Sequence, residues 1–265
     1  MEELSPENIK SGLRTAFIGQ NVLYYPTIGS TNDVAREVAG RGAPEGTLVI
    51  ADEQTAGKGR LGRRWLAPPG TSLLMSLLFY PDLAPSQAQR LTMLCSLAVV
   101  DGIRAVTGLR PQLKWPNDIL INYKKVGGIL TETGVTGDHL DYVVVGIGLN
   151  VNLEVSRIQE IAATATSLWQ ELGREVPRLR LLQEILERVE GRYQRLEAGE
   201  SPYEEWASNL VTLGRRVRVT TPEGQEEGWA EGVDEDGALI LRRGDGSMVL
   251  IAAGDVTLRA ETPCR

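Results

Sequence analysis

The stretch EQTAGKGRLGRRW, residues 53–65, has the most unusual local composition in the chain, with four basic side chains and three glycines in thirteen positions. Its basic residues are Lys58, Arg60, Arg63 and Arg64. We expect Gly57, Gly59 and Gly62 to adopt positive φ angles and to bring backbone N–H groups close to a ligand. The stretch follows the apolar run TLVIADE (47–53), which predicts a strand. It therefore predicts a mobile loop that binds a phosphate or a carboxylate, and the alternative is a solvated basic turn.

The charge balance of the whole chain makes this loop a local feature. The chain has 28 basic and 35 acidic side chains, a net charge of −7, and a pI near 5.0, which argues against a general nucleic-acid binder. The loop matches neither GxxxxGK[ST] nor GxGxxG, the two common phosphate-binding patterns. Trp65 at its end offers a planar surface that either covers a nucleobase or packs in the protein.

Strands and helices alternate through the first half of the chain, and strands cluster after it. Helices are expected from Ser5 onward, after the N-cap residues 30–33, and over 85–107, where the apolar spacing is most clearly helical. Strands are expected at 22–26, 47–53, 72–81, 113–121, 126–134 and 142–152. This order predicts an α+β fold with a mixed sheet and helices packed on one side of it.

The character of the chain changes after Asn152. Residues 165–173 and 177–199 are expected to form helices, the second long and amphipathic. From Leu213 onward, short β-prone runs alternate with the turn sequences PEG, DEDG and GDG, which is typical of a small β-barrel of roughly fifty residues. We therefore predict two domains, a large one over 1–210 and a barrel over 211–265.

Rare residue types restrict the chemistry. Cys95 and Cys264 lie far apart and form neither a zinc-ligand spacing nor a disulfide framework, so a reducing cytoplasm is expected. His139 is the single histidine, which argues against a histidine-dependent mechanism or a site with several histidine ligands. The sequence predicts neither a signal peptide nor a transmembrane segment.

A second group of polar residues lies in KWPNDILINYKKVGGIL, residues 114–130. Trp-Pro-Asn-Asp is a turn sequence, and a structural turn accounts for its proline and asparagine. It accounts less well for Lys114, Lys124 and Lys125 in the same hairpin, because an acid facing lysines beside glycines is typical of a phosphate or magnesium site. From the sequence alone, Asp118 is a metal ligand, a base or an ion-pair partner.

The third stretch is VVVGIGLNVN, residues 143–152. An apolar strand interrupted by Gly146 and Gly148 brings its backbone near a ligand, or is a core strand with a glycine bulge. Taken alone, the stretch supports both interpretations equally.

Together these stretches resemble one family, the biotin–protein ligases. The matching motifs are STND (30–33), EQTAGKGRLGRRW (53–65), KWPNDI (114–119), KVGGIL (125–130), GIGLNVN (146–152) and ATSL (165–168), and the resemblance covers roughly residues 22–260. It implies a catalytic domain like that of class II aminoacyl-tRNA synthetases, followed by a small SH3-like β-barrel.

The resemblance also implies roles for individual residues. Those that match biotin-binding positions are Ser30, Thr31, Asn32, Gln54, Gly57, Lys58, Gly59, Lys125 and Gly128. Those that match positions near the nucleotide are Arg60, Arg63, Trp65, Asn117, Asp118 and Asn150, with Asp118 also a candidate Mg²⁺ ligand. Arg60 and Lys125 match the residues that carry the chemistry. Lys58 stands where many relatives have arginine, which keeps the charge but loses the planar fork, so no bidentate phosphate contact is assigned to it.

The activity implied is the activation of biotin by ATP, with Mg²⁺, followed by transfer to a lysine of a biotin carboxyl carrier protein. About 20 residues precede the first strand, too few for the DNA-binding module of some relatives, so neither DNA nor a membrane is an expected partner. A homodimer through an edge strand of the main sheet is compatible with the resemblance. The alternatives are a lipoate–protein ligase, a ligand-sensing regulator without ligase activity, and an adenylate-binding protein without transfer activity.

Overall fold

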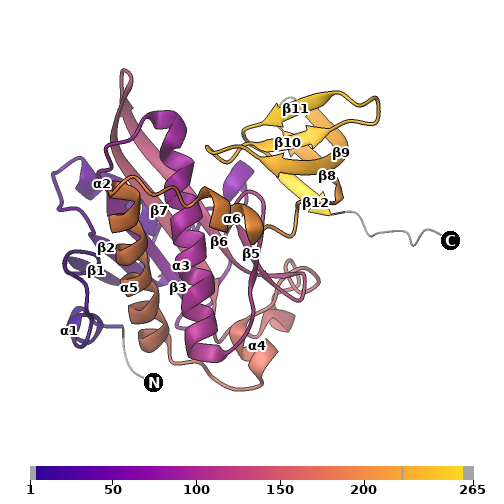
Figure 1. Cartoon of the computed structure of the whole chain (residues 1–265). Helices are drawn as coiled ribbons and strands as arrows, with labels where there is room; N and C mark the ends of the chain where they lie inside the picture. Colours follow the sequence, from indigo (N-terminus) through magenta and orange to yellow (C-terminus); the bar gives the residue numbers. More distant parts are fainter. Residues whose placement is uncertain (1–3, 222–223, 259–265) are drawn as a thin grey trace.

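The large sheet lies in the first 150 residues of the chain. A computed structural model describes residues 4–221 and 224–258 (Figure 1), and Cys264 lies outside this part of the chain. The strands of the sheet are β1 (Val22–Ile28), β2 (Leu48–Gln54), β3 (Ser72–Phe79), β4 (Gln112–Lys114), β5 (Asp118–Ile121), β6 (Lys124–Thr136) and β7 (His139–Asn150). Their order is β1-β2-β3-β7-β6-β5-β4. β1 and β2 are parallel and the other neighbours are antiparallel, so the predicted mixed sheet is confirmed.

The strands of the central hairpin are longer than the sequence suggests. β6 and β7 span 13 and 12 residues, where the sequence predicts short strands. The predicted strand 113–121, which precedes this hairpin in the chain, is divided into β4 and β5 by the Trp-Pro-Asn turn. The β5–β6 turn then returns the chain through Asn122 and Tyr123, which both have positive φ angles.

Helices cover both faces of this sheet. α3 (Gln89–Thr107) and α5 (Arg178–Glu197) lie side by side on one face (Figure 1). α2 (Thr31–Ala39) packs on the opposite face, against Val49, Leu78 and Val144. The prediction of helices on one side was therefore wrong. The physical reason is strand alternation, because the first four residues of β2 and all of β3 are buried and their successive side chains point to opposite faces.

The predicted core helix 85–107 begins as a 3-10 turn, Pro85–Ala88, and continues as α3, which ends at the left-handed Gly108. Gly102 lets α3 approach α5 closely, since a Cβ there would lie 2.7 Å from Ile185 Cγ1. Three short helices complete the described part: α1 (Pro6–Lys10), α4 (Leu168–Leu172) and α6 (Tyr203–Ser208). Within that part of the chain, no helix is long and apolar enough to cross a membrane.

The C-terminal region forms a second, antiparallel sheet. Its strands are β8 (Arg216–Thr221), β9 (Gly224–Val233), β10 (Leu239–Arg242), β11 (Met248–Ile251) and β12 (Asp255–Leu258), in the order β11-β10-β9-β8-β12. The arrangement agrees with the predicted SH3-like barrel. Among the contacts that join it to the large domain, Trp115 Nε1 donates to the Gly237 carbonyl at 2.8 Å, and Arg90 pairs with Asp236 at 3.2 Å. The exact boundary at 210/211 stays a prediction.

Candidate active site

The floor of the candidate site is a part of the large sheet without side chains. Gly128 on β6 pairs directly with Gly148 on β7, and Leu130 pairs with Gly146. These glycines belong to the set of alternate residues on the α2 face. A Cβ on Gly146 would lie 2.1 Å from Asn32 Oδ1, and one on Gly148 would lie 2.6 Å from Trp65 Cε2. Such contacts are shorter than real Cβ contacts, so a side chain at either position would displace Asn32 or Trp65.

A cavity of about 350 Å³ lies above this floor. It is bounded by the start of α2, the loop after β2, the β4–β5 turn, the segment 160–165 and the tip of the barrel. The sequence-predicted site residues that line it are Ser30, Thr31, Asn32, Gln54, Lys58, Gly59, Arg60, Arg63, Trp65, Asn117, Asp118, Lys125, Gly128 and Asn150. Four segments far apart in the sequence thus contribute to one cavity.

The glycine loop is a small hairpin over this cavity. Gly59 N–H donates to the Arg63 carbonyl at 2.7 Å, and Trp65 N–H donates to the Gly57 carbonyl at 3.0 Å. Positive φ angles occur at Leu61 and Gly62 and not at the other two glycines, which corrects the expectation for all three. Gly57 does not line the cavity but a neighbouring hollow. It is needed for packing, because a Cβ there would lie 2.7 Å from the Trp65 carbonyl oxygen.

One end of the cavity is polar and neutral. Thr31 donates from both its backbone N–H and its hydroxyl to Gln54 Oε1, at 2.7 and 3.1 Å. Ser76 on β3 lies within hydrogen-bond distance of Thr31 Oγ1 and Asn32 Oδ1, at 2.8 and 2.6 Å. Ser30, Thr31 and Asn32 are each at most 4% exposed. This end therefore offers fixed hydrogen-bonding groups and no net charge of its own.

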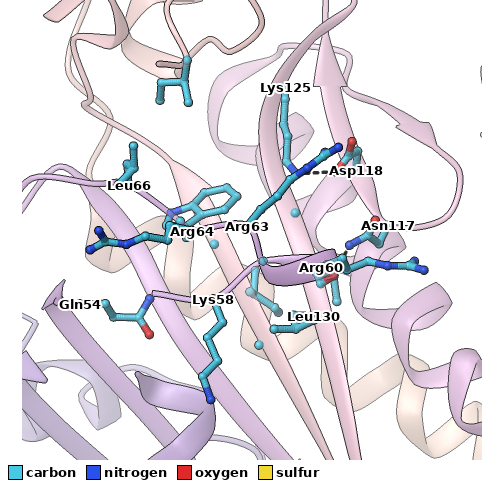
Figure 2. A pocket seen from close by; sticks show the side chains of 18 of the residues that line it. Gln54, Lys58, Arg60, Arg63, Arg64, Leu66, Asn117, Asp118, Lys125 and Leu130 are labelled. Atoms are coloured by element: carbon cyan, nitrogen blue, oxygen red, sulfur yellow. Dashed lines mark hydrogen bonds and ion pairs between the residues drawn. The ribbon is translucent and has the colours of Figure 1, made fainter. Parts of the chain in front are cut away.

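The opposite end is charged. Asp118, on the first position of β5, lies 2.5 Å from Lys125 Nζ and 3.5 Å from Lys114 Nζ (Figure 2). Of the three roles open to Asp118 from the sequence, the structure shows the ion pair. Asn117 is held beside it by a hydrogen bond from Nδ2 to the Ile129 carbonyl at 2.5 Å. In the described residues, no group of three or more His, Cys, Asp or Glu side chains is placed to hold a metal.

The four basic residues of the loop have four different environments. Lys58 pairs with Asp33 on α2 and points away from the Lys125–Asp118 pair (Figure 2). Arg63 pairs with Asp255 at the start of β12, and Arg64 donates to the Thr55 carbonyl at 3.0 Å. Arg60 makes no hydrogen bond or ion pair within the described residues. Burial lowers the pKa of its guanidinium, and the charges of Asp118 and Asp255 oppose that shift.

Trp65 covers the glycine floor. Its ring carbons are the nearest atoms to Gly148, and Lys125 Nζ lies 5.6 Å from the ring centroid. Trp65 Nε1 and Asn150 Oδ1 are both buried, and neither has a hydrogen-bond partner in the described structure. Asn150 Nδ2, in contrast, donates to the Thr166 carbonyl at 3.0 Å. Buried polar groups without partners are uncommon, and both of these residues line the cavity.

Comparisons with known proteins agree with this geometry. Residues 24–150 match the Biotin/lipoate A/B protein ligase family, and residues 212–259 match the Biotin protein ligase C terminal domain. The bifunctional ligase/repressor BirA of Bacillus spizizenii is 41% identical over 254 residues, covering 95% of this chain and 78% of that protein. The biotin–[acetyl-CoA-carboxylase] ligase of Mycobacterium tuberculosis is 36% identical, covering 86% and 85%. The chain belongs to the biotin protein ligase family.

A solved structure extends the match to three dimensions. The biotin protein ligase from Aquifex aeolicus in complex with biotin and ATP superimposes with a TM-score of 0.76 and 30% identity, covering 91% of this chain and all of that one. The resemblance inferred from the sequence motifs is thus confirmed. The roles of individual residues in this family member stay predictions.

The family motifs did not indicate three residues near the cavity. Ser76 and Glu132 lie outside the cavity and contact Asn32, and Asp255 of the barrel lines the cavity. A serine inside the otherwise apolar strand SLLMSLLF is a signal for the first, whereas nothing in the sequence indicates Asp255. Two arginines of the barrel have partners elsewhere: Arg215 donates to Tyr123 Oη at 3.0 Å, and Arg218 pairs with Glu227 at 2.7 Å. The barrel therefore meets the cavity through Gly254 and Asp255.

Proposed function

We propose that this protein is an ATP-dependent ligase that attaches biotin to a lysine of a biotin carboxyl carrier protein. The observation that carries the proposal is one cavity with two chemically different ends joined by a glycine floor. Biotin has a neutral ureido ring and a carboxylate tail, which suit the neutral end and the charged end respectively. The glycine floor leaves room for the chain between them.

The reaction has two steps that balance without a redox partner. A carboxylate oxygen of biotin attacks the α-phosphorus of ATP, forming a C–O–P linkage and breaking the bond to the β-phosphate, so that pyrophosphate leaves. The neutral ε-amine of the acceptor lysine then attacks the acyl carbon, forming an amide and releasing AMP as the C–O bond breaks. The amine gives up one proton in this step. Family membership and the named activities of the relatives support this assignment over the regulator and the adenylate-binding protein.

Lys125 and Arg60 are the proposed catalytic residues. Lys125 Nζ and the Arg60 guanidinium lie at the charged end, where negative charge accumulates as the α-phosphorus is attacked. Fixed cations in a partly buried site stabilise such charge without reorganisation. The proposed biotin-binding residues are Ser30, Thr31, Asn32, Gln54, Lys58, Gly59, Lys125 and Gly128, and Gly57, also predicted from the sequence, supports the loop by packing instead. The proposed nucleotide-binding residues are Arg60, Arg63, Trp65, Asn117, Asp118 and Asn150.

The donors at the charged end suit a magnesium ion brought with the nucleotide. Asp118 supplies carboxylate oxygens, and Asn150 Oδ1 is a buried oxygen without a hydrogen-bond partner among the described residues. Magnesium prefers oxygen ligands and is commonly held by one or two protein groups together with substrate phosphates. We propose that Asp118, with Asn150, would hold it. When bound, the ion would neutralise phosphate charge, while Lys125 and Arg60 orient the biotin carboxylate and the α-phosphate.

Two further candidates are separable by binding measurements. The family model over residues 24–150 covers lipoate ligases as well, so a calorimetric titration with biotin and with lipoate decides between the two acids.

The relative from B. spizizenii is named a ligase and a repressor. A gel shift on the promoter of biotin-synthesis genes tests DNA binding, for which we expect no tight complex. The proposed setting is the cytoplasm, where ATP and the carrier protein are present.

The decisive experiment is mass spectrometry of a biotin carboxyl carrier domain incubated with this protein, biotin and ATP–Mg²⁺. We expect a mass increase of one biotinyl group, and no increase for a carrier whose acceptor lysine is replaced by arginine. An unmodified carrier, in a sample where the protein binds biotin, would overturn the transfer step. Light scattering in the same buffers tests the proposed homodimer through the exposed edge of β1.

A further inference from the structure

Two residues outside the cavity hold the Asn32 amide side chain of its neutral end. Ser76 is fully buried on β3, and Glu132 lies on β6, two positions along the same face from Leu130. Neither lines the cavity itself. Both contact Asn32, which does.

Glu132 determines which way the Asn32 amide faces. Asn32 Nδ2 lies 2.7 Å from Glu132 Oε2 and 3.2 Å from the Leu130 carbonyl, and both of these groups only accept hydrogen bonds. The nitrogen must therefore point toward Glu132. The oxygen, Oδ1, then points toward Ser76 and lies over Gly146 in the cavity floor.

A backbone N–H fixes the orientation of the Gln54 amide, and here the oxygen, not the nitrogen, is the atom held by the protein. Its Oε1 accepts from the Thr31 backbone N–H, which only donates. Its Nε2 must face the other way, and within the described residues it makes no hydrogen bond. The cavity wall thus presents an amide donor from Gln54 and an amide oxygen from Asn32.

We infer that Glu132 and Ser76 are positioning residues for the recognition of the ureido ring, an inference that rests on the proposed function. A cyclic urea needs a donor for its carbonyl oxygen and an acceptor for a ring N–H. If the Asn32 amide were rotated by 180°, its oxygen would face the Glu132 carboxylate and the two would repel. Glu132 therefore strongly favours the orientation in which Asn32 Nδ2 donates to it. The site then selects against rings that lack the N–H, because Asn32 Oδ1 keeps its hydrogen bond from Ser76 but loses the one from the ligand.

The neighbouring arginine provides a matched control. Arg36 on α2 lies 3.3 Å from Glu132 Oε1, on the oxygen that does not contact Asn32. Its side chain is 46% exposed, as expected of a surface ion pair of small energetic value. Arg36→Ala removes the ion pair and leaves the hydrogen bond to Asn32 in place.

The test compares calorimetric binding of biotin and of the two biotins methylated on either ureido nitrogen. We expect the wild type to bind biotin and to discriminate against one methylated form. Glu132→Ala is expected to weaken biotin binding about 10- to 100-fold, because an oriented hydrogen bond beside a charge is lost. Binding of the disfavoured methylated form should change far less, since it never used Asn32 Oδ1. Glu132→Gln, whose amide oxygen still accepts from Asn32, should restore binding to within about threefold of the wild type.

Ser76→Ala is the second variant and keeps the buried volume nearly unchanged. We expect it to weaken biotin binding roughly fivefold with the same asymmetry between biotin and the methylated form. The inference is overturned if Glu132→Ala binds biotin like the wild type, if it weakens both ligands equally, or if Arg36→Ala reproduces its loss. A wild-type protein that binds lipoate and not biotin would instead contradict the proposed function, so the two failures are distinct.

Discussion

The two ends of the cavity are built in opposite ways. At the neutral end, Thr31, Asn32 and Ser76 are buried and contact one another within a single domain. At the charged end, the Lys125 side chain is 37% exposed and that of Arg63 is 68% exposed, and one counterion, Asp255, comes from the barrel. Selectivity is expected to depend on the first end and charge stabilisation on the second. The following variants test that division.

The largest effect is expected at the charged end, from Lys125→Gln. Loss of the cation should reduce biotin-dependent pyrophosphate exchange by about 10²- to 10³-fold, the usual cost of removing one preorganised group that stabilises transition-state charge. Lys124→Gln, one residue earlier on the same strand and exposed, is the matched control and should leave exchange unchanged. A wild-type exchange rate in Lys125→Gln would remove this lysine from the phosphate site.

The floor between the two ends is tested by Gly148→Val. Even a Cβ there would lie 2.6 Å from the Trp65 ring, so the ring or the strand must move. Overpacking of this kind costs about 1–3 kcal/mol, and we expect biotin affinity to fall roughly 5- to 150-fold. Gly191→Ala on α5, where no atom lies within 4 Å of the new Cβ, should leave affinity unchanged and raise the free energy of unfolding by about 0.5–1 kcal/mol. Unaltered biotin binding in Gly148→Val would show that the floor is not used.

Arg60→Ala tests retention of the intermediate. The half-buried guanidinium has no protein hydrogen bond within the described residues, and we expect its loss to accelerate release of the adenylate roughly tenfold while biotin binding is largely retained. The measurement is the dissociation rate of purified biotinyl-adenylate complex. Arg64→Ala, which removes a contact to the Thr55 carbonyl, is the comparison and should change the rate little. Equal rates in wild type and Arg60→Ala would contradict the role of the loop.

The smallest effect is expected from Asp255→Asn. The substitution frees Arg63 from its counterion, so the KM for ATP should fall by no more than about threefold, since exposed ion pairs contribute about 0–1 kcal/mol. The difference should disappear at high salt, because exposed charges are screened. Glu226→Gln, which breaks the barrel pair with Arg243 away from the cavity, should have no effect on KM. A salt-independent change would mean that Asp255 acts by another route.

The sequence was a good guide to the site and a partial guide to the fold. Lys58, Arg60 and Trp65 were indicated by the basic, glycine-rich composition of a loop after a predicted strand and by the resemblance of that loop to a family motif. The side of the sheet on which α2 packs was not predictable, since the first half of β2 and most of β3 are apolar and show no alternation. The different environments of Lys58 and Arg60 were also not predictable, because Asp33, Asp118 and Asp255 are distant in the sequence.

The sequence by itself determined the residue types of the loop EQTAGKGRLGRRW and, through motifs that resemble those of one family, the family of the chain. The change in local composition along the chain predicted the two-domain order. Only the tertiary structure decided that this loop is a hairpin, that Gly57 serves packing, and that Arg60 remains without a protein hydrogen bond among the described residues. It also decided that Glu132 and Ser76 hold the Asn32 amide of the neutral end. The physical reason is that hydrogen bonds and ion pairs depend on distances between strands, and strand register brings together residues far apart in the chain.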